Sequence, residues 1–176
     1  MMGDHFRTLA EPARAEVFRR IGLPLDCADQ VGVALIRPAG GGLFEFDTTG
    51  AVAALIWPVV DCYSDDGVEI ADYADLIAVD ANNTTKVWSL TGETEMLGEG
   101  NLASLFGCRL RVHRSPLEWW IAGRDGVAIV RWSPRVAAML HFAPSGIVLK
   151  KQHRKYAENI ERLINEHVRP AEIFLD

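Results

Sequence analysis

The chain has 176 residues and a mass of 19.5 kDa, and 49% of its residues are hydrophobic and 24% charged. These proportions exclude collagen-like, intrinsically disordered and disulfide-scaffold chains. The net charge of −6 is unevenly spread, because residues 1–100 hold 17 acidic and 6 basic side chains, whereas residues 101–176 hold 7 acidic and 12 basic ones. The asymmetry predicts two parts, 1–100 and 101–176, within one compact domain or as two domains. The parts either neutralise each other or leave a basic surface for an anion.

The first part is predicted to be a helix followed by antiparallel strands. Apolar residues recur at helical spacing from Asp4 to Ile21, and Gly22 and Pro24 end the pattern. The apolar face of this helix either packs on its own domain or binds a partner. The run Gly40–Gly42 is expected to connect a hairpin, since it lacks the Lys-Ser/Thr of a phosphate loop. Alternating or β-branched runs between turn signals predict strands at 31–37, 43–47, 53–62, 76–80 and 86–90.

From residue 101 the pattern changes to alternating strands and helices. After a short helix at 101–106, strands are predicted at 109–113, 127–132, 147–150 and 171–175, and helices at 116–122, 135–142 and 153–168. Ser115-Pro116 and Ser133-Pro134 each place a capping serine before a first-turn proline. The alternation predicts a small, largely parallel sheet covered by helices. The expected fold class is therefore α+β: an N-terminal helix and antiparallel β part, then a βαβαβαβ part.

The run LRVHRSPLEWWIAGRDGVAIV, residues 110–130, resembles the opening of a Toprim domain, the catalytic module of primases and topoisomerases. Residues 56–98 are similar to the segment that precedes Toprim in phage-type primases, and the whole chain resembles uncharacterised alphaproteobacterial, often prophage-linked proteins. Toprim chemistry needs a Glu after the first strand and an Asp-x-Asp pair after the third, which hold Mg²⁺. Here these positions fall at Arg114-Ser115 and near Lys151-Gln152-His153. Cations stand where the metal needs anions, so the resemblance implies a degenerate Toprim-like domain. We accordingly assign no catalytic residue, metal or cofactor.

The best candidate for a binding site is a group of basic residues near the predicted carboxyl edge of the parallel strands. Such edges, and helix N-termini, are where α/β proteins bind anions. The site is therefore predicted to bind a phosphorylated ligand or a nucleic-acid backbone. The alternative is a solvated helix start that the acidic part balances. The candidate residues are Arg114, Arg135, Lys150, Lys151, His153, Arg154 and Lys155.

Trp119 and Trp120 are neighbours on a predicted helix, where successive side chains point about 100° apart. One is expected to pack on the sheet. The other is expected near the surface, in a subunit or protein interface or stacked on a base.

An acidic run between residues 61 and 80 has two interpretations. It lacks the register of an EF-hand, which favours a solvated loop over a Ca²⁺ or Mg²⁺ site. Its members are Asp61, Asp65, Asp66, Glu69, Asp72, Asp75 and Asp80.

Cys27, Cys62 and Cys108 lack the close pairing of zinc ligands, and Cys108 with His113 matches no nucleophile signature. No secretory signal or bilayer-length apolar run is present, so a cytoplasmic protein with reduced thiols and no membrane association is expected.

Three functional hypotheses follow. The first is a non-catalytic accessory protein, phage-derived and related to replication, that binds nucleic acid or a phosphorylated ligand at the basic edge. The second is a protein–protein interaction module that uses the N-terminal helix and an exposed Trp. The third is a metal-dependent enzyme that uses the acidic segment 61–80.

Overall fold

The computed structural model describes residues 11–23, 31–65, 68–102 and 108–168, with only the backbone described for 11–14 and 61–73. The fold is α+β, as the sequence predicts. The chain forms two compact units, the first of residues 1–94 with 115–117, and the second of residues 95–114 with 118–176. Each unit is described by itself. In the described ranges, no helix has the length and apolar character needed to cross a bilayer.

The first unit contains α1 (Glu11–Ile21) and a five-stranded antiparallel sheet in the order β2-β1-β3-β4-β5. The strands are β1 (Gly32–Pro38), β2 (Phe44–Phe46), β3 (Val52–Asp65), β4 (Val68–Asp80) and β5 (Val87–Ser89). The expected hairpin is present, because β1 and β2 pair across a 3₁₀ turn at Gly40–Gly42. Leu43 bridges to Ser89, so the sheet curls until its two edges meet. Alternate residues of the three middle strands form its core with Phe44: Ala34, Ile36, Ala54, Ile56, Leu76 and Ala78.

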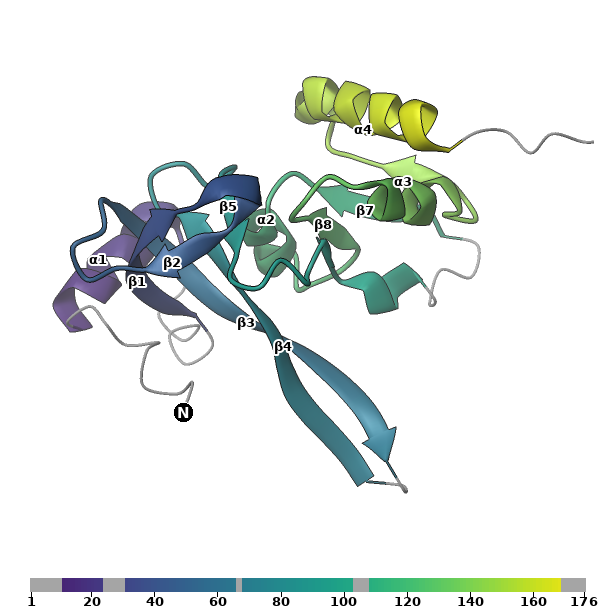
Figure 1. Cartoon of the computed structure of the whole chain (residues 1–176). Coiled ribbons are helices and arrows are strands. Elements are labelled where there is room, and N and C mark those ends of the chain that lie inside the picture. Colours follow the sequence, from purple (N-terminus) through teal and green to yellow (C-terminus); the bar gives the residue numbers. More distant parts are fainter. Residues whose placement is uncertain (1–10, 24–30, 66–67, 103–107, 169–176) are drawn as a thin grey trace, which may run out of the picture. The chain divides into compact units, whose positions relative to one another are not determined.

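Strands β3 and β4 are longer than predicted and pair as far as Asp65 and Val68. Their register shifts between Val59 and Val60, one residue after Pro58, which has no N–H to donate to the ladder and is typical of bulges and edge strands. The prediction of a solvated loop for the acidic run is wrong at the backbone level, since residues 61–65 and 68–80 are strand. Neither β1 nor β5 pairs with the outer part, which continues as a two-stranded arm (Figure 1).

The second unit has a four-stranded sheet in the order β6-β8-β7-β9. Its elements are β6 (Met96–Leu97), β7 (Leu110–His113), α2 (Pro116–Ile121), β8 (Val127–Ile129), α3 (Pro134–His141), β9 (Ile147–Val148) and α4 (Arg154–His167). Strand β7 is parallel to both β8 and β9, whereas β6 is antiparallel to β8. Three of the four predicted parallel strands are therefore present, and the fourth, 171–175, lies outside the described residues. The short helix predicted at 101–106 is a 3₁₀ turn, Glu99–Leu102, and residues 103–107 are not described.

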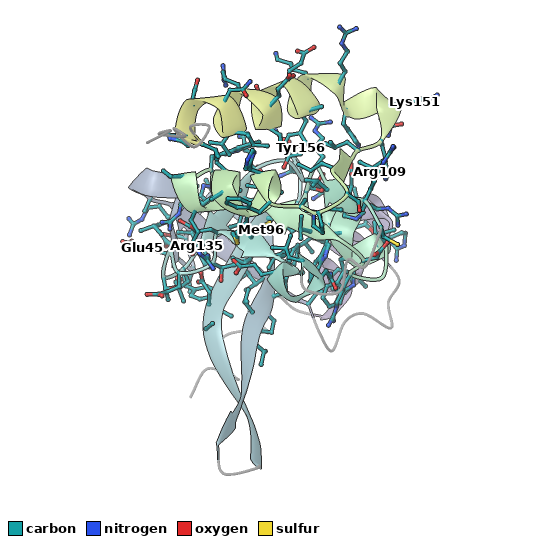
Figure 2. All side chains as sticks on the ribbon, turned by 90° about the vertical axis from the view of Figure 1, so that its right-hand side faces the viewer. Glu45, Met96, Arg109, Arg135, Lys151 and Tyr156 are labelled. Carbon is teal, nitrogen blue, oxygen red and sulfur yellow. The ribbon has the colours of Figure 1, made fainter. Side chains whose placement is uncertain are left out.

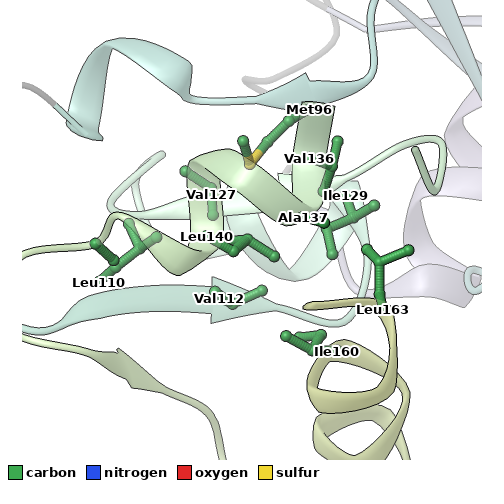
Figure 3. Close-up of a cluster of buried hydrophobic side chains, with 11 residues drawn as sticks. Met96, Leu110, Val112, Val127, Ile129, Val136, Ala137, Leu140, Ile160 and Leu163 are labelled. Atoms are coloured by element: carbon green, nitrogen blue, oxygen red, sulfur yellow. The ribbon is translucent and has the colours of Figure 1, made fainter. Parts of the chain in front are cut away.

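Helices α3 and α4 pack on this sheet around one hydrophobic core (Figure 3). The expected cap of α3 is present, because the Ser133 hydroxyl accepts a hydrogen bond of 3.1 Å from the Val136 N–H. The buried residues of the core are Met96, Leu110, Val112, Val127, Ile129, Val136, Ala137, Leu140, Ala143, Ile160 and Leu163. This core fixes the ends of β7 and β9, where the candidate site lies.

Candidate functional site at the carboxyl edge of β7 and β9

The order β8-β7-β9 places the first strand of the parallel set between the other two. The chain leaves β7 for one neighbour and later returns to the other side, so a topological switch point lies between β7 and β9. In open α/β sheets, ligands bind outside the carboxyl ends of the strands at such a point. His113 is the last residue of β7, and Lys150 follows β9 by two residues. The predicted basic edge therefore coincides with the place where the fold is able to hold a ligand.

Glu118 of α2 is the carboxylate at this edge. Its Oε1 lies 3.2 Å from Nε2 of His153, and its Oε2 lies 3.7 Å from Nζ of Lys150. The His153 side chain is only 5% exposed, whereas Glu118 is 26% exposed. A mostly buried imidazole and a nearby ammonium thus share one carboxylate, which neutralises part of the positive charge that the sequence predicts here.

His113 is buried beside this pair, and its Nε2 lies 2.8 Å from the carbonyl oxygen of Asp125. A carbonyl only accepts, so Nε2 carries a hydrogen and Nδ1 is the acceptor in the neutral ring. Burial lowers the pKa of His113, the bond to Asp125 and the charge of Glu118 oppose the shift, and Lys150 and Arg111 add to it. The neutral ring is therefore the form that the folded protein favours.

We expect the stability of the protein to decrease as the pH falls through and below 6.5, because protonation of His113 is easier in the unfolded chain. The pKa of His113 is lowered on folding from its ordinary value of 6.5, so its contribution is present above that value and is lost below it. Urea unfolding across this range, for the wild type and His113→Gln, measures the effect. A dependence that is unchanged in the variant would contradict it.

Tyr156, in the first turn of α4, lies at the same edge. Burial raises the pKa of its phenol, Glu118 raises it further, and Arg114 opposes the rise. The phenol therefore stays protonated at neutral pH, and these effects place Arg114 and Glu118 within electrostatic range of it. The Tyr156 ring also contacts Trp132 edge to face, with 5.5 Å between the ring centroids.

The seven predicted cations do not form one cluster. Lys150 and His153 lie on Glu118, and Arg154 pairs with Glu158 one turn along α4, at 3.1 Å. Arg135 pairs instead with Glu99, at 2.7 Å, and Figure 2 shows it on the opposite side of the unit from Lys151. In the described part of the chain, no ion pair forms at the exposed side chains of Arg114, Lys151 and Lys155. These three remain available to an anion.

The two adjacent tryptophans differ, as their spacing predicts. Trp119 is buried, and its Nε1 donates a 2.9 Å hydrogen bond to the carbonyl oxygen of Gly126. Trp120 is half-buried, and the Arg124 guanidinium lies over its ring, 4.0 Å from the centroid. A role of Trp120 in an interface or in stacking on a base stays a prediction.

Two members of the acidic run have their carboxylates engaged by the protein itself. Asp75 accepts hydrogen bonds from the Ser89 hydroxyl and from several backbone N–H groups, and Asp80 accepts from Asn82 and Asn83. The side chains of the other members lie outside the described part. Among described side chains, no three His, Cys, Asp or Glu gather as a set of metal ligands. Cys108 lies two residues before β7, and His113 is the last residue of that strand.

Sequence reasoning missed Glu118, Tyr156 and Trp132. Glu118 lies three residues after the capping Ser115, in the first turn of the helix that begins where β7 ends. A side chain at this position faces the carboxyl edge of β7. The spacing from Ser115 is therefore a signal from which Glu118 could have been identified. No pattern in the sequence marks Tyr156 or Trp132, because their contact joins two elements. No protein-family model, curated protein or solved structure matches the chain.

Proposed function

We propose that the second unit is a non-catalytic binding module that holds a phosphate group at the carboxyl edge of β7 and β9. One observation carries the proposal. Five cations lie on the segments that begin at this topological switch point, and only two of them pair with carboxylates: Lys150 with Glu118, and Arg154 with Glu158. The other three, Arg114, Lys151 and Lys155, leave an excess of three positive charges among the described side chains.

The size of this excess suits one phosphate group or a few, from a nucleic-acid backbone or from a phosphorylated small molecule. The resemblance to a Toprim domain supports binding without catalysis, because the carboxylate at this edge, Glu118, is engaged by Lys150 and His153. An accessory role in phage-derived replication, in the cytoplasm, is the biological setting that this resemblance suggests.

We expect the wild type to bind single- and double-stranded oligonucleotides with an affinity that falls with salt, with a log–log slope of about −2 to −3 for three phosphate contacts. Lys151→Glu with Lys155→Glu should flatten the slope by about 2, since each lost phosphate contact removes about one unit. Fluorescence anisotropy at several salt concentrations measures this, with nucleotides and inorganic phosphate as competitors to separate a polymer from a small ligand.

The matched control is Arg109→Glu with Arg162→Glu, which changes the net charge equally at exposed positions of the same unit. Arg109 directly precedes β7, at the amino end of that strand, and Arg162 lies two turns along α4 from Arg154. Both double variants should unfold at nearly the wild-type temperature, because exposed charges contribute little to stability. Equal losses of binding in the two variants, or no salt-dependent binding by the wild type at low ionic strength, would contradict the proposal.

A protein-interaction module is the second candidate function, and the arm of β3 and β4 favours it. From Val60 to Tyr73 the two strands pair only with each other. An isolated two-stranded ribbon is marginally stable in water. A partner that adds contacts along the arm would stabilise it. Replacing residues 61–72 by an Asn-Gly turn tests this idea, which fails if the shortened and full-length proteins capture the same partners from cell extract and sediment alike.

A further inference from the structure

We propose that the phosphate-binding edge takes single-stranded nucleic acid, with one base stacked on Trp132. This inference rests on the proposed function and names its ligand class. All five tryptophans lie in the described part of the chain, and Trp132, 43% exposed, is the most open of them. It follows β8 by three residues, so it stands at the same carboxyl edge as His113 and Lys150.

The ring of Trp132 is tied to the basic edge through Tyr156. The two rings meet edge to face, an arrangement that leaves at least one face of Trp132 uncovered by Tyr156. Tyr156 lies within electrostatic range of Arg114 and follows Lys155 on α4. Tyr156 thus links the exposed ring of Trp132 to Arg114, a cation that pairs with no carboxylate among the described residues. An aromatic face beside positive charge is the combination that single-strand binding proteins use.

Glu95 holds Trp132 in place from both sides. Its Oε1 accepts a 3.0 Å bond from Arg131, and its Oε2 accepts a 2.9 Å bond from the Ser133 hydroxyl. The Glu95 carbonyl oxygen also accepts from the N–H groups of Val130 and Arg131. An exposed tryptophan whose two neighbours are clamped is pre-organised, so stacking a base on it costs little conformational entropy.

The test compares an oligothymidylate with an abasic strand of the same length. Trp132→Ala should weaken binding of the oligothymidylate about 10- to 100-fold, the range expected for one stacked base, and should leave binding of the abasic strand unchanged. Trp132→Phe should recover much of the loss, and the wild-type tryptophan fluorescence should be quenched by the oligothymidylate alone.

Phe142→Ala is the matched control. Phe142 is 74% exposed and directly follows α3, which starts at the carboxyl edge after β8 and ends before β9 begins. It therefore stands at the opposite edge of the sheet, and its removal should not change binding of either strand.

Two results would overturn the stacking proposal and leave the phosphate proposal intact. One is equal affinity of the wild type for the base-bearing and abasic strands. The other is equal behaviour of the Trp132→Ala and Phe142→Ala variants, with salt-dependent binding preserved. Absence of binding to either strand would also overturn the stacking proposal, and the phosphate proposal would fail with it if nucleotides and inorganic phosphate did not bind either.

Discussion

Asp75→Asn should lower the free energy of unfolding of the protein by about 3–5 kcal/mol, because at least two buried donors would lose their acceptor at about 1–3 kcal/mol each. Asp75 is 2% exposed. Its carboxylate accepts five hydrogen bonds of 2.6–3.1 Å, from the Ser89 hydroxyl and from the backbone N–H groups of Leu76, Leu90, Thr91 and Thr94.

The loss is large because the amide of asparagine has one acceptor oxygen where the carboxylate has two. Its NH₂ group would face the donors from Ser89 and Thr94, or those from the other three N–H groups if the amide were turned. These donors fix the turn after β5 to the start of the inner part of β4, where Leu43 and Ser89 close the curled sheet. Asp75 therefore joins the turn after β5 to β4 through hydrogen bonds, in addition to the packing of Leu76 and Leu90 in the core.

Urea unfolding at neutral pH measures this change, with Asp47→Asn as the control. Asp47 also accepts from a backbone N–H and a hydroxyl, both of Thr49, but these groups lie at the surface, where water can replace a lost hydrogen bond. The loss of stability should therefore be much smaller than for Asp75. Losses of stability of similar size in the two variants would show that the hydrogen bonds of Asp75 contribute no more than those of an exposed aspartate.

The same carboxylate gives a signature at acid pH. Burial raises the pKa of Asp75, but the hydrogen bonds from Ser89, Thr91, Thr94 and Leu76 together lower it below its ordinary value of 3.8. Its stabilising contribution is therefore present above 3.8 and is lost as the pH falls through the lower pKa of the folded protein. The stability of the Asp75→Asn variant should depend less on pH in that range.

The sequence predicts the parallel strands well because their signals are local. Ser133-Pro134 marks the start of α3, and Gly123 and Asp125-Gly126 mark the turn into β8, without reference to any distant residue. The place of the candidate site follows from the same signals, since it depends only on where β7 and β9 end.

The composition of the site is less predictable from sequence, because ion pairs depend on distances between elements. The sequence places Lys150 and Arg135 at the same predicted edge, yet Lys150 pairs with Glu118 and Arg135 pairs with Glu99. The aromatic residues show the same limit. Two adjacent tryptophans attract attention in the sequence, but Trp119 is buried, and the exposed ring is Trp132, whose partner Tyr156 is 24 positions away.

The turn at Asp125-Gly126 affects both the stability of the second unit and the position of His113 in the candidate site. Gly126 has a φ of +76°, and a Cβ atom there would stand 2.2 Å from the carbonyl oxygen of Arg111. Arg111 lies in β7, between two parallel neighbours, so its backbone cannot move aside without breaking the sheet. The Gly126 carbonyl oxygen also accepts from Trp119 and from Asn101.

Gly126→Ala should therefore lower the free energy of unfolding by about 3–5 kcal/mol, through a backbone clash added to the cost of a left-handed alanine. The control is Gly123→Ala, where φ is +72° but no atom lies within 4 Å of the added Cβ. It carries only the conformational cost, about 1–2 kcal/mol. Because Asp125 holds His113 through its carbonyl oxygen, Gly126→Ala should also shift the His113 ring signals in NMR spectra at temperatures where the variant is folded, whereas Gly123→Ala should not. Equal destabilisation by the two alanines would mean that the backbone of β7 moves aside at Arg111. That result would contradict the idea that the candidate site depends on a rigid edge of the sheet.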